Sequence, residues 1–466
     1  MTKAQATTTT GTPAAGGPIE IRGGTVLTLT DRVARQASVY IDAGVIVAVG
    51  SEPPSGWAAR AAQADVIDAT GCVVLPGLVQ AHTHVCQTLC RGGADDLPLL
   101  EWLRERIWPY EAALDERAMR ACARLAAAEL IRGGTTAILD MGTVHETDAL
   151  MDELGRSGLR AVVGKAMMDS GDGVPRRLRE TTHDSLAASD DLASRWVRPD
   201  VYGGRLSYAY APRFVLSCSE GLLREVVDRM QEGARVHTHA SEQRAEVAIV
   251  RQLLGADNVA WLDDIGMGGE QVTLAHCVHV TDDEIRRMAA RGTHVTHCPS
   301  SNLKLASGIA PVPTLLAAGI NVALGADGVP CNNNLDGFLE LRLAALLHKP
   351  AFGAQALPAW TALELATRGG ARALGLEDRV GTLEPGKRAD VIVVNARAPH
   401  LVPGDDPASL LVYAARANDV RDVVVEGRVL LRRGEFTAES GLDAEEVVAR
   451  GQEEARRVAQ RVGEMR

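Results

Sequence analysis

Eight short apolar segments, separated by polar or helix-like stretches, occupy the middle of this chain of 466 residues. Segments of this length and continuous hydrophobicity are typical of strands buried on both faces of a parallel sheet. Eight such units within about 300 residues predict an α/β fold, a (β/α)₈ or TIM barrel. A doubly wound open sheet is the alternative. The predicted strands are residues 72–84, 135–142, 159–168, 205–213, 235–242, 272–280, 294–300 and 321–328, with helices expected at 116–132, 220–231, 245–254 and 282–290.

Both ends of the chain have a different pattern, in which short strands alternate with turns. Strands are expected at 19–22, 25–28 and 45–49, and again at 390–394, 420–425 and 428–431. Each set is too small to be stable alone, so we expect both to form one composite β-sandwich. Charged residues four positions apart predict a C-terminal helix. The expected boundaries are a disordered tail at 1–18, the sandwich at 19–75 and 377–442, the barrel at 76–376 and the helix at 443–466.

The composition argues against several classes of partner. The formal net charge is −11 and no basic stripe is present, so a nucleic-acid partner is not expected. No apolar run reaches the roughly 20 residues that span a bilayer, and the N-terminal residues lack the apolar core of a secretory signal. The eight cysteines are scattered, which is typical of reduced thiols. We therefore expect a cytoplasmic protein without a membrane partner.

A His-x-His pair ends the first predicted strand of the barrel. Because side chains two positions apart on a strand share a face, His82 and His84 can point toward one ligand. Neutral imidazole is a common ligand of zinc. A pair of core histidines is the alternative, and the pair alone does not decide between the two interpretations.

Two further metal-ligand candidates lie at the ends of the fifth and eighth predicted strands. His239 would be the third ligand and Asp327 the fourth, although a turn carboxylate is the alternative for Asp327. His237 is deeper in its strand, and we favour a role in supporting a ligand from behind, or in packing, over a ligand role. The carboxyl ends of barrel strands meet at one face, so a barrel would bring these residues together.

Glu242, His276 and Asp327 are the candidate catalytic residues. Glu242 follows His239 by three positions, just beyond the strand end, where a carboxylate can exchange protons with a metal-activated water. A glutamate that stabilises a helix N-terminus is the alternative. His276 ends the sixth strand and can orient the same water. Together these residues predict a metal-dependent hydrolase that acts on a small molecule.

Several segments around these residues closely resemble the amidohydrolase superfamily. Within it, they are similar to the branch of methylthioadenosine/S-adenosylhomocysteine (or 5′-deoxyadenosine) deaminases and triazine chlorohydrolases. The resemblance implies a barrel beside a small β-sandwich, one zinc or iron ion held by the four ligands named above, and water activation by Glu242 and His276. By analogy it also implies a homo-oligomer. The segments that carry it are 76–84, 239–242, 274–277, 297–305, 325–342 and 385–391.

One metal ion is expected rather than two. Related barrels with two metals often use a bridging lysine at the end of the fourth strand. That strand ends here in Arg213, which stays protonated and cannot be a ligand, and Lys165 is on the predicted third strand. His297, at the end of the seventh strand, could line the pocket or pack in the core.

The resemblance also implies substrate contacts. Glu111 matches a glutamate that holds ribose hydroxyls in the nucleoside deaminases, and Trp102 matches an aromatic residue near the ligand. Two positions depart from the pattern, because Arg213 replaces a common histidine and Cys331 replaces a serine or similar residue. We assign Cys331 to the pocket wall rather than to a second metal or to a nucleophile. Arginine would suit a carbonyl or carboxylate better than an adenine nitrogen.

The expected reaction is hydrolytic deamination of an aminated purine nucleoside such as 5′-deoxyadenosine, methylthioadenosine or S-adenosylhomocysteine. It belongs to the hydrolases of carbon–nitrogen bonds in cyclic amidines. One alternative keeps the site and changes the substrate to guanine, oxidised guanine, a pterin or an s-triazine that loses chloride. A metal-binding barrel without activity is the non-enzyme alternative, which the presence of both Glu242 and His276 disfavours.

Overall fold

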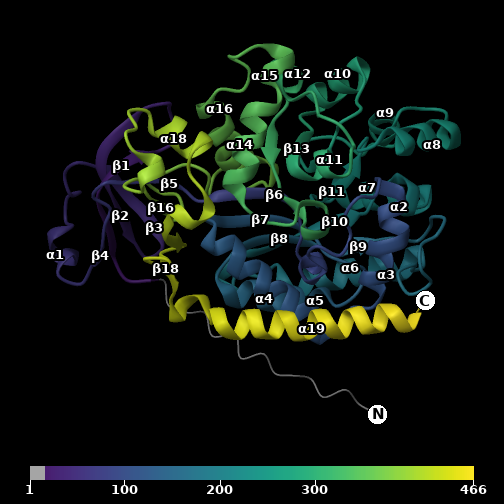
Figure 1. Cartoon of the computed structure of the whole chain (residues 1–466), viewed down its shortest axis with the longest axis horizontal. Helices are drawn as coiled ribbons and strands as arrows, with labels where there is room; N and C mark the ends of the chain where they lie inside the picture. Colours follow the sequence, from purple (N-terminus) through teal and green to yellow (C-terminus); the bar gives the residue numbers. More distant parts are fainter. Residues whose placement is uncertain (1–15, 466) are drawn as a thin grey trace.

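The structure is a computed structural model that describes residues 16–465, so most of the tail expected at 1–18 lies outside the described residues. Within that range, parallel strands form a sheet in the order β14-β13-β12-β11-β10-β8-β7-β6-β15 (Figure 1). Because β14 and β15 are successive parts of residues 322–328, the order closes into a ring. The predicted (β/α)₈ barrel is confirmed. Its strands are β6 (Leu78–His84), β7 (Thr135–Met141), β8 (Arg160–Gly164), β10 (Leu206–Pro212), β11 (Arg235–Ala240), β12 (Val272–His276), β13 (His294–His297), β14 (Val322–Leu324) and β15 (Asp327–Gly328), with β9 (Ala166–Met167) paired to β10.

Helices cover the outside of the barrel. The longest of those between strands, α4, begins after Asp115, whose side chain accepts a hydrogen bond from the Ala118 N–H. Its buried face is mainly alanine, with Met119, Cys122, Leu130 and Ile131, which is the apolar face expected of a helix packed on a sheet. The main helices are α4 (Glu116–Arg132), α5 (Thr147–Ser157), α6 (Thr182–Trp196), α7 (Glu220–Gln231), α8 (Arg244–Leu254), α9 (Asn258–Asp264), α10 (Asp282–Arg291), α11 (Pro299–Lys304), α12 (Val312–Ala317) and α14 (Gly337–Leu347).

The first predicted barrel strand, 72–84, is wrong as a single element. It is two strands in two different sheets, β5 (Cys72–Pro76) and β6. Gly77 joins them where the backbone passes Thr136, and a Cβ at Gly77 would lie about 2.1 Å from the Thr136 hydroxyl oxygen. A continuous apolar run cannot reveal such a change of sheet, because strands in both sheets are buried.

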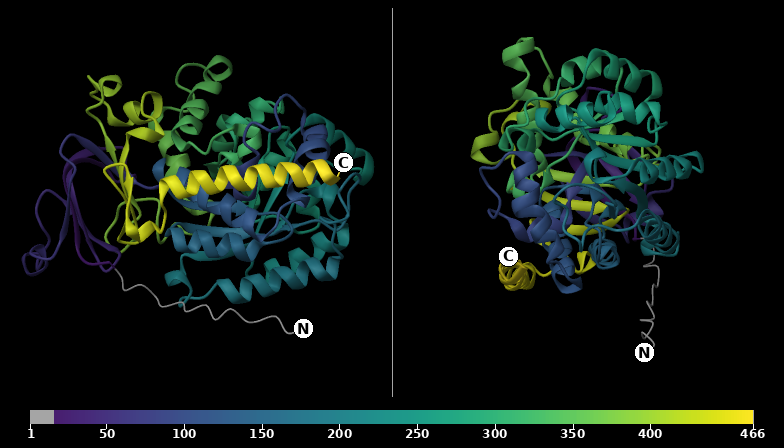
Figure 2. Two further views of the ribbon diagram at one scale, coloured as in Figure 1. Left: turned by 60° about the horizontal axis from the view of Figure 1, so that its bottom comes forward. Right: turned by 90° about the vertical axis from the view of Figure 1, so that its right-hand side faces the viewer.

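Strands from both chain ends form a second sheet at one end of the barrel (Figure 2). Its order is β19-β18-β17-β16-β5-β1-β2-β3, with β4 paired to β1, so the predicted joint β-structure is confirmed. The strands expected at 19–22 and 25–28 are one strand, with a register shift between Ile21 and Gly24. In the described part of the chain these strands are β1 (Ile19–Leu27), β2 (Ala34–Asp42), β3 (Val45–Gly50), β4 (Asp65–Asp68), β16 (Val391–Asn395), β17 (Val420–Val425), β18 (Arg428–Arg432) and β19 (Glu435–Phe436), in addition to β5.

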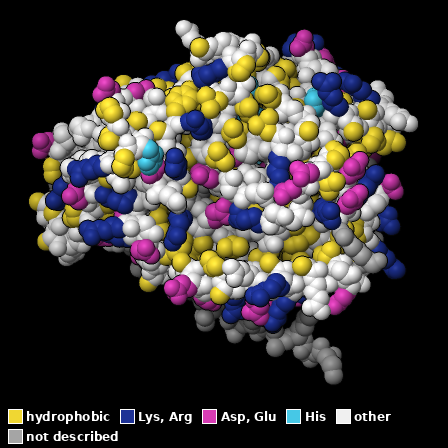
Figure 3. Space-filling view, in the orientation of Figure 1, with side chains coloured by type: hydrophobic (Ala, Val, Ile, Leu, Met, Phe, Trp, Pro, Cys, Tyr) yellow, Lys and Arg dark blue, Asp and Glu magenta, His cyan; other side chains and the backbone are white. Residues whose placement is uncertain are grey.

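The C-terminal helix α19 (Ala444–Met465) lies along the outside of the molecule against α4 (Figures 1 and 2). All eight cysteines are free thiols. On the face shown in Figure 3, basic and acidic side chains are interspersed, without an extended basic stripe. None of the helices in residues 16–465 combines the length and hydrophobicity that crossing a bilayer requires.

Candidate metal centre

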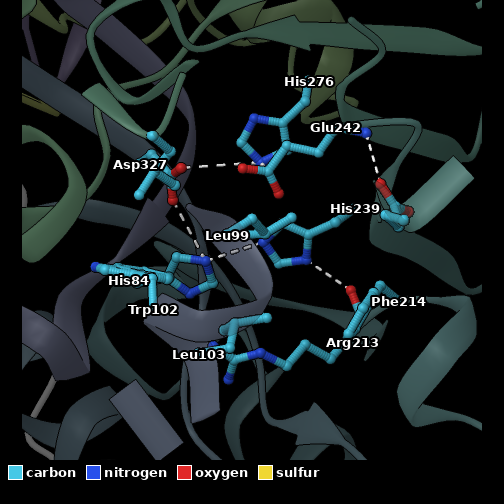
Figure 4. A pocket seen from close by; sticks show the side chains of 12 residues that line it. His84, Leu99, Trp102, Leu103, Arg213, Phe214, His239, Glu242, His276 and Asp327 are labelled. Atoms are coloured by element: carbon cyan, nitrogen blue, oxygen red, sulfur yellow. Dashed lines mark hydrogen bonds and ion pairs between the residues drawn. The ribbon is translucent and has the colours of Figure 1, made fainter. Parts of the chain in front are cut away.

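The structure brings four predicted ligands together at the carboxyl ends of three barrel strands. His82 and His84 end β6, His239 lies in β11 and Asp327 begins β15, and one potential ligand atom from each lies within 4.8 Å of the others. Nε2 of His84 is 3.1 Å from Nε2 of His239, and Oδ1 of Asp327 is 3.2 Å from Nε2 of His82. Figure 4 shows His84, His239 and Asp327 directed toward one another.

Hydrogen bonds to backbone carbonyls fix the tautomers of two of these imidazoles. Nδ1–H of His84 donates to the carbonyl oxygen of Met141 at 2.7 Å, and Nδ1–H of His239 donates to that of Arg213 at 2.6 Å. Since a carbonyl can only accept, each ring keeps its Nε2 lone pair free. Metal-binding histidines usually donate their other ring N–H in this way, to a carboxylate, a backbone carbonyl or a water.

His82 is oriented by another histidine. Its Nδ1 is 2.9 Å from Nε2 of His237, and its own Nε2 is buried without a hydrogen bond. With the proton of His82 on Nδ1, that nitrogen donates to His237 and the Nε2 lone pair points to the other ligands. His237 therefore supports His82 from behind and lies outside the ligand group, which is the first of the two roles that we favoured for it.

The protonation states suit a cation. Burial lowers the pKa of His84 to about 3, and it also lowers the pKa values of His82 and His239. Burial alone would raise the pKa of Asp327, but the nearby imidazoles, His82 foremost, hold it well below its usual value. Neutral imidazoles and an ionised carboxylate are the forms that bind a divalent metal. Three imidazole nitrogens, among them the buried Nε2 of His82 that lacks a hydrogen bond, and one carboxylate oxygen therefore fit a zinc-type ion.

Glu242 and His276 lie beside this group. Nε2 of His276 is 3.6 Å from Oε2 of Glu242 and 3.8 Å from Oδ2 of Asp327. Burial, with a contribution from Asp327, raises the pKa of Glu242 well above its usual value. A buried carboxyl with a raised pKa can both accept and return a proton.

Sequence reasoning missed two residues that orient this pair. The Asn302 side-chain oxygen is 2.9 Å from Nδ1 of His276, and the Glu246 carboxylate accepts a hydrogen bond from the Glu242 backbone N–H at 2.8 Å. Glu246 also completes a capping box with Gln243 at the start of α8. Glutamate three positions after a polar residue is a recognisable helix-start pattern, so Glu246 could have been found.

Backbone strain is concentrated at these strand ends. Ser241, His276, Cys277 and Asp327 all have positive φ angles, between 48° and 73°, although none is glycine. Each such residue costs on the order of 1–3 kcal/mol, which the surrounding packing must offset. The residues with positive φ turn the chain sharply at the ends of β11 and β12 and at β15, which are the positions of the candidate site residues.

A pocket with about 400 Å³ of empty space, which includes open solvent, lies beside the four ligands. Figure 4 shows the polar residues around it together with an apolar group that includes Leu99, Trp102 and Leu103. These three residues come from α2 (Leu99–Trp102) and the following π-helical turn η2 (Leu103–Ile107). The lining residues are His84, Leu99, Trp102, Leu103, Arg213, Phe214, His239, Glu242, Glu246, His276, Leu305 and Asp327.

The four predicted substrate residues are placed differently from one another. Trp102 and Arg213 line the cavity, whereas Glu111 and Cys331 are not among its lining residues. The buried Glu111 carboxylate accepts hydrogen bonds from Nη1 of Arg213 at 2.7 Å and from the Gln87 amide at 2.8 Å. Cys331 is fully buried, with its sulfur 3.0 Å from the Gly328 carbonyl oxygen.

Two other residues weighed in the sequence lie apart from the ligand group. Lys165 forms a buried ion pair with Glu180 at 2.6 Å, so its amine is committed elsewhere. His297 is fully buried, and its ring centroid lies 5.5 Å from that of His348. Neither residue belongs to the group of His82, His84, His239 and Asp327.

A barrel that gathers three imidazoles, a carboxylate and an acid–base pair at its strand ends defines the class of metal-dependent barrel hydrolases. The chain belongs to the amidohydrolase family, whose sequence profile matches residues 73–430. It is 42% identical, over 93% of its length and 98% of the relative, to a 5-methylthioadenosine/S-adenosylhomocysteine deaminase of Moorella thermoacetica.

Solved structures show the same likeness. An adenosine deaminase from Xanthomonas campestris with bound zinc matches with a TM-score of 0.85 and 34% identity, covering 97% of this chain and 99% of that one. An atrazine chlorohydrolase from Arthrobacter aurescens in complex with zinc matches with a TM-score of 0.86 and 27% identity, covering 94% and 100%.

Proposed function

We propose that the protein is a metal-dependent hydrolase that deaminates an aminated purine nucleoside of the adenosine type and releases ammonia. Candidate substrates are 5′-deoxyadenosine, methylthioadenosine and S-adenosylhomocysteine. The observation that carries the proposal is the meeting of four ligand atoms within 4.8 Å, next to the buried pair of Glu242 and His276. The relatives named as deaminases, at about 40% identity over nearly the whole chain, support the choice of reaction.

In this proposal His82, His84, His239 and Asp327 hold one divalent ion, zinc or iron. Such an ion lowers the pKa of a coordinated water from 15.7 to about 7 and so supplies a nucleophile at neutral pH. The zinc in the two related structures favours zinc. Lys165 is paired with Glu180, and the strand-four end carries Arg213 in place of a lysine, which supports one metal rather than two.

The side chains of this protein then perform the proton transfers. Glu242 takes the proton of the attacking water as the bond to the amine-bearing ring carbon forms. The tetrahedral carbon collapses when Glu242 returns that proton to the departing nitrogen, and ammonia leaves. His276, held by Asn302, and Asp327 orient the attack. Trp102 and Arg213 contact the substrate. Glu111 holds Arg213 in place from behind the cavity wall, and Cys331 supports that wall without lining the cavity.

A second candidate keeps the same residues and changes the ring. Arg213 in the cavity wall can donate to an oxo group, which favours guanine, oxidised guanine or a pterin. The likeness to an atrazine chlorohydrolase also makes an s-triazine a candidate, with chloride as the leaving group. We further propose a cytoplasmic homo-oligomer that requires neither nucleic acid nor membrane.

A substrate panel scored for ammonia and chloride release tests the proposed function. The panel contains adenosine, 5′-deoxyadenosine, methylthioadenosine, guanine, a pterin and atrazine, each incubated with the zinc-loaded protein. We expect ammonia release to be fastest from a nucleoside. Chloride release without any ammonia release would overturn the deaminase proposal.

A further inference from the structure

Two adjacent residues of the short helix α11 each hold a side chain of the candidate site. The Ser301 hydroxyl donates a hydrogen bond to Oδ2 of Asp327 at 2.6 Å, which leaves Oδ1 to face the ligand histidines. The side-chain oxygen of the next residue, Asn302, is 2.9 Å from Nδ1 of His276. Figure 4 shows Asp327 and His276 as neighbours, with Nε2 of His276 3.8 Å from the same Oδ2. The position of α11 therefore sets where both side chains point.

A buried carboxyl group holds the start of α11. It belongs to Glu340 on α14, a residue that is 1% exposed and is not among those that line the cavity. Its Oε2 accepts a hydrogen bond from the Ser300 backbone N–H at 3.1 Å, and its Oε1 accepts one from the Ser300 hydroxyl at 2.5 Å. Ser300 directly precedes Ser301 and Asn302. One carboxylate thus restrains the residue next to those that hold the site.

The same carboxylate also reaches the chain just before Asp327. Oε1 of Glu340 accepts a second hydrogen bond, at 2.9 Å, from the side-chain amide of Asn332, the last residue of α13 (Val329–Asn332). That amide also donates to the carbonyl oxygen of Ala326 at 2.7 Å. Glu340 therefore connects the backbone that carries Asp327 to the helix that holds the Asp327 carboxylate.

The charge of Glu340 does not explain its place in the core. The donors to its carboxylate are a backbone N–H, a hydroxyl and an amide, which are all neutral. Burial raises the pKa of Glu340 to about 7. For an acid, a pKa raised by folding means that ionisation weakens the fold, and the loss grows as the pH rises from about 4.5 to about 7. The contribution of this carboxylate is therefore geometric, because its two oxygens join three segments of the chain.

We propose that Glu340 is a positioning residue of the metal centre, which directs the Asp327 carboxylate and the His276 imidazole by holding α11 in place. The inference rests on the proposed function for the metal ion and for the roles of these two residues. Changing a residue behind the ligands of a metal ion typically costs 10–100-fold in metal affinity or activity. Because Glu340 does not line the cavity, its replacement should alter metal binding and turnover rather than substrate binding.

Zinc affinity and the visible spectrum of the cobalt-loaded protein test the inference without a substrate. Glu340→Gln keeps the size of the side chain but turns an amide N–H toward the Ser300 N–H, where an oxygen now accepts. We expect the zinc dissociation constant to rise about 10–100-fold, and the cobalt bands, which depend on ligand geometry, to shift. The control is Glu454→Gln, which removes an equally buried carboxylate that pairs with Arg117, and should change neither.

Wild-type zinc affinity and cobalt bands in a folded Glu340→Gln protein would overturn the inference, and so would equal changes in Glu340→Gln and Glu454→Gln. Circular dichroism shows whether the variants fold. If Glu340→Gln does not fold, Ser300→Ala makes the same comparison, because it removes only the hydroxyl donor. We then expect the zinc dissociation constant to rise about 3–10-fold, as for the loss of one hydrogen bond, and an unchanged value would contradict the inference.

A double-mutant cycle tests the route through α11. Ser301→Ala removes the hydrogen bond to Asp327. If Glu340 acts through Ser301, Glu340→Gln should raise the zinc dissociation constant by a smaller factor in the Ser301→Ala protein than in the wild type. Equal factors in the two backgrounds would show that Glu340 does not act through α11, and would overturn the inference.

Kinetics separate positioning from substrate binding. With the best substrate of the panel, we expect kcat of zinc-saturated Glu340→Gln to fall about tenfold or more and KM to stay within about threefold. A raised KM with an unchanged kcat would contradict a positioning role. If no substrate releases ammonia, the deaminase proposal fails while the zinc and cobalt comparisons still decide the role of Glu340. A wild-type protein that binds no zinc would overturn both.

Discussion

At the residue scale, the proton-carrying role of Glu242 makes a sharp prediction. Glu242→Gln keeps the size of the side chain and leaves the four proposed ligands untouched, but it cannot accept the proton of the attacking water. We expect turnover to fall by about 10²–10⁴-fold with zinc content unchanged. Ammonia release and metal analysis of the same preparation measure both effects.

The control for that prediction is Glu246→Gln, which retains an oxygen that can accept the Glu242 N–H hydrogen bond. We expect a smaller loss of turnover, since the acid–base carboxyl is still present. A Glu242→Gln protein with wild-type turnover would remove Glu242 from the mechanism. Loss of zinc in Glu242→Gln would instead make this residue part of the metal centre.

The sequence predicted the convergence of His82, His84, His239 and Asp327, because their positions at strand ends follow from strand periodicity and barrel geometry. It did not predict which residues make the contacts around these ligands. The Glu111–Arg213 pair joins the segment after β6 to the end of β10, and its distance depends on the path of long connections. Local patterns carry no information about such a contact.

At the scale of elements, α4 and α7 match their predicted limits, since each has a capping residue before an amphipathic run. The strand predicted at 72–84 failed for a reason that also belongs to this scale. The run from Cys72 to Leu75 contains no charge or proline. The only sequence sign of the change of sheet is therefore Pro76-Gly77, and this dipeptide is equally compatible with a bulge in one continuous strand.

The helix α19 offers a matched pair of valines for testing its packing. Val458 is 1% exposed and belongs to the main hydrophobic core, whereas Val448 on the same helix is 51% exposed. We expect Val458→Asp to lower the free energy of unfolding by about 3 kcal/mol, because it buries a carboxylate without a partner. Val448→Asp should change it by less than about 0.5 kcal/mol.

Urea unfolding of the zinc-loaded protein measures both effects as shifts of the midpoint. The comparison holds the helix and the substitution constant, so the difference reports burial alone. Equal shifts for the two variants would mean that Val458 is not buried beneath α19 in solution. A large shift for Val448→Asp alone would place its exposed face in an interface between subunits.

At the scale of the whole molecule, the metal centre ties together segments that are distant in the sequence. Its proposed ligands come from β6, β11 and β15, which are the first, fifth and eighth strands of the ring. β15 pairs with β6, so the ligands also span the point where the barrel closes. An ion that binds only the folded arrangement must therefore stabilise the closed barrel.

Metal removal should consequently destabilise the protein as a whole. At a free metal concentration 1,000-fold above the dissociation constant, metal binding raises the free energy of unfolding by about 4 kcal/mol. A chelator should remove this contribution. We expect thermal unfolding to shift to lower temperature on chelation and to recover when zinc is added back. Glu242→Gln should respond as the wild type does, whereas Asp327→Ala should unfold at one temperature with or without chelator. A chelator shift of wild-type size in Asp327→Ala would show that Asp327 is not needed to hold the ion, and would contradict its place among the ligands.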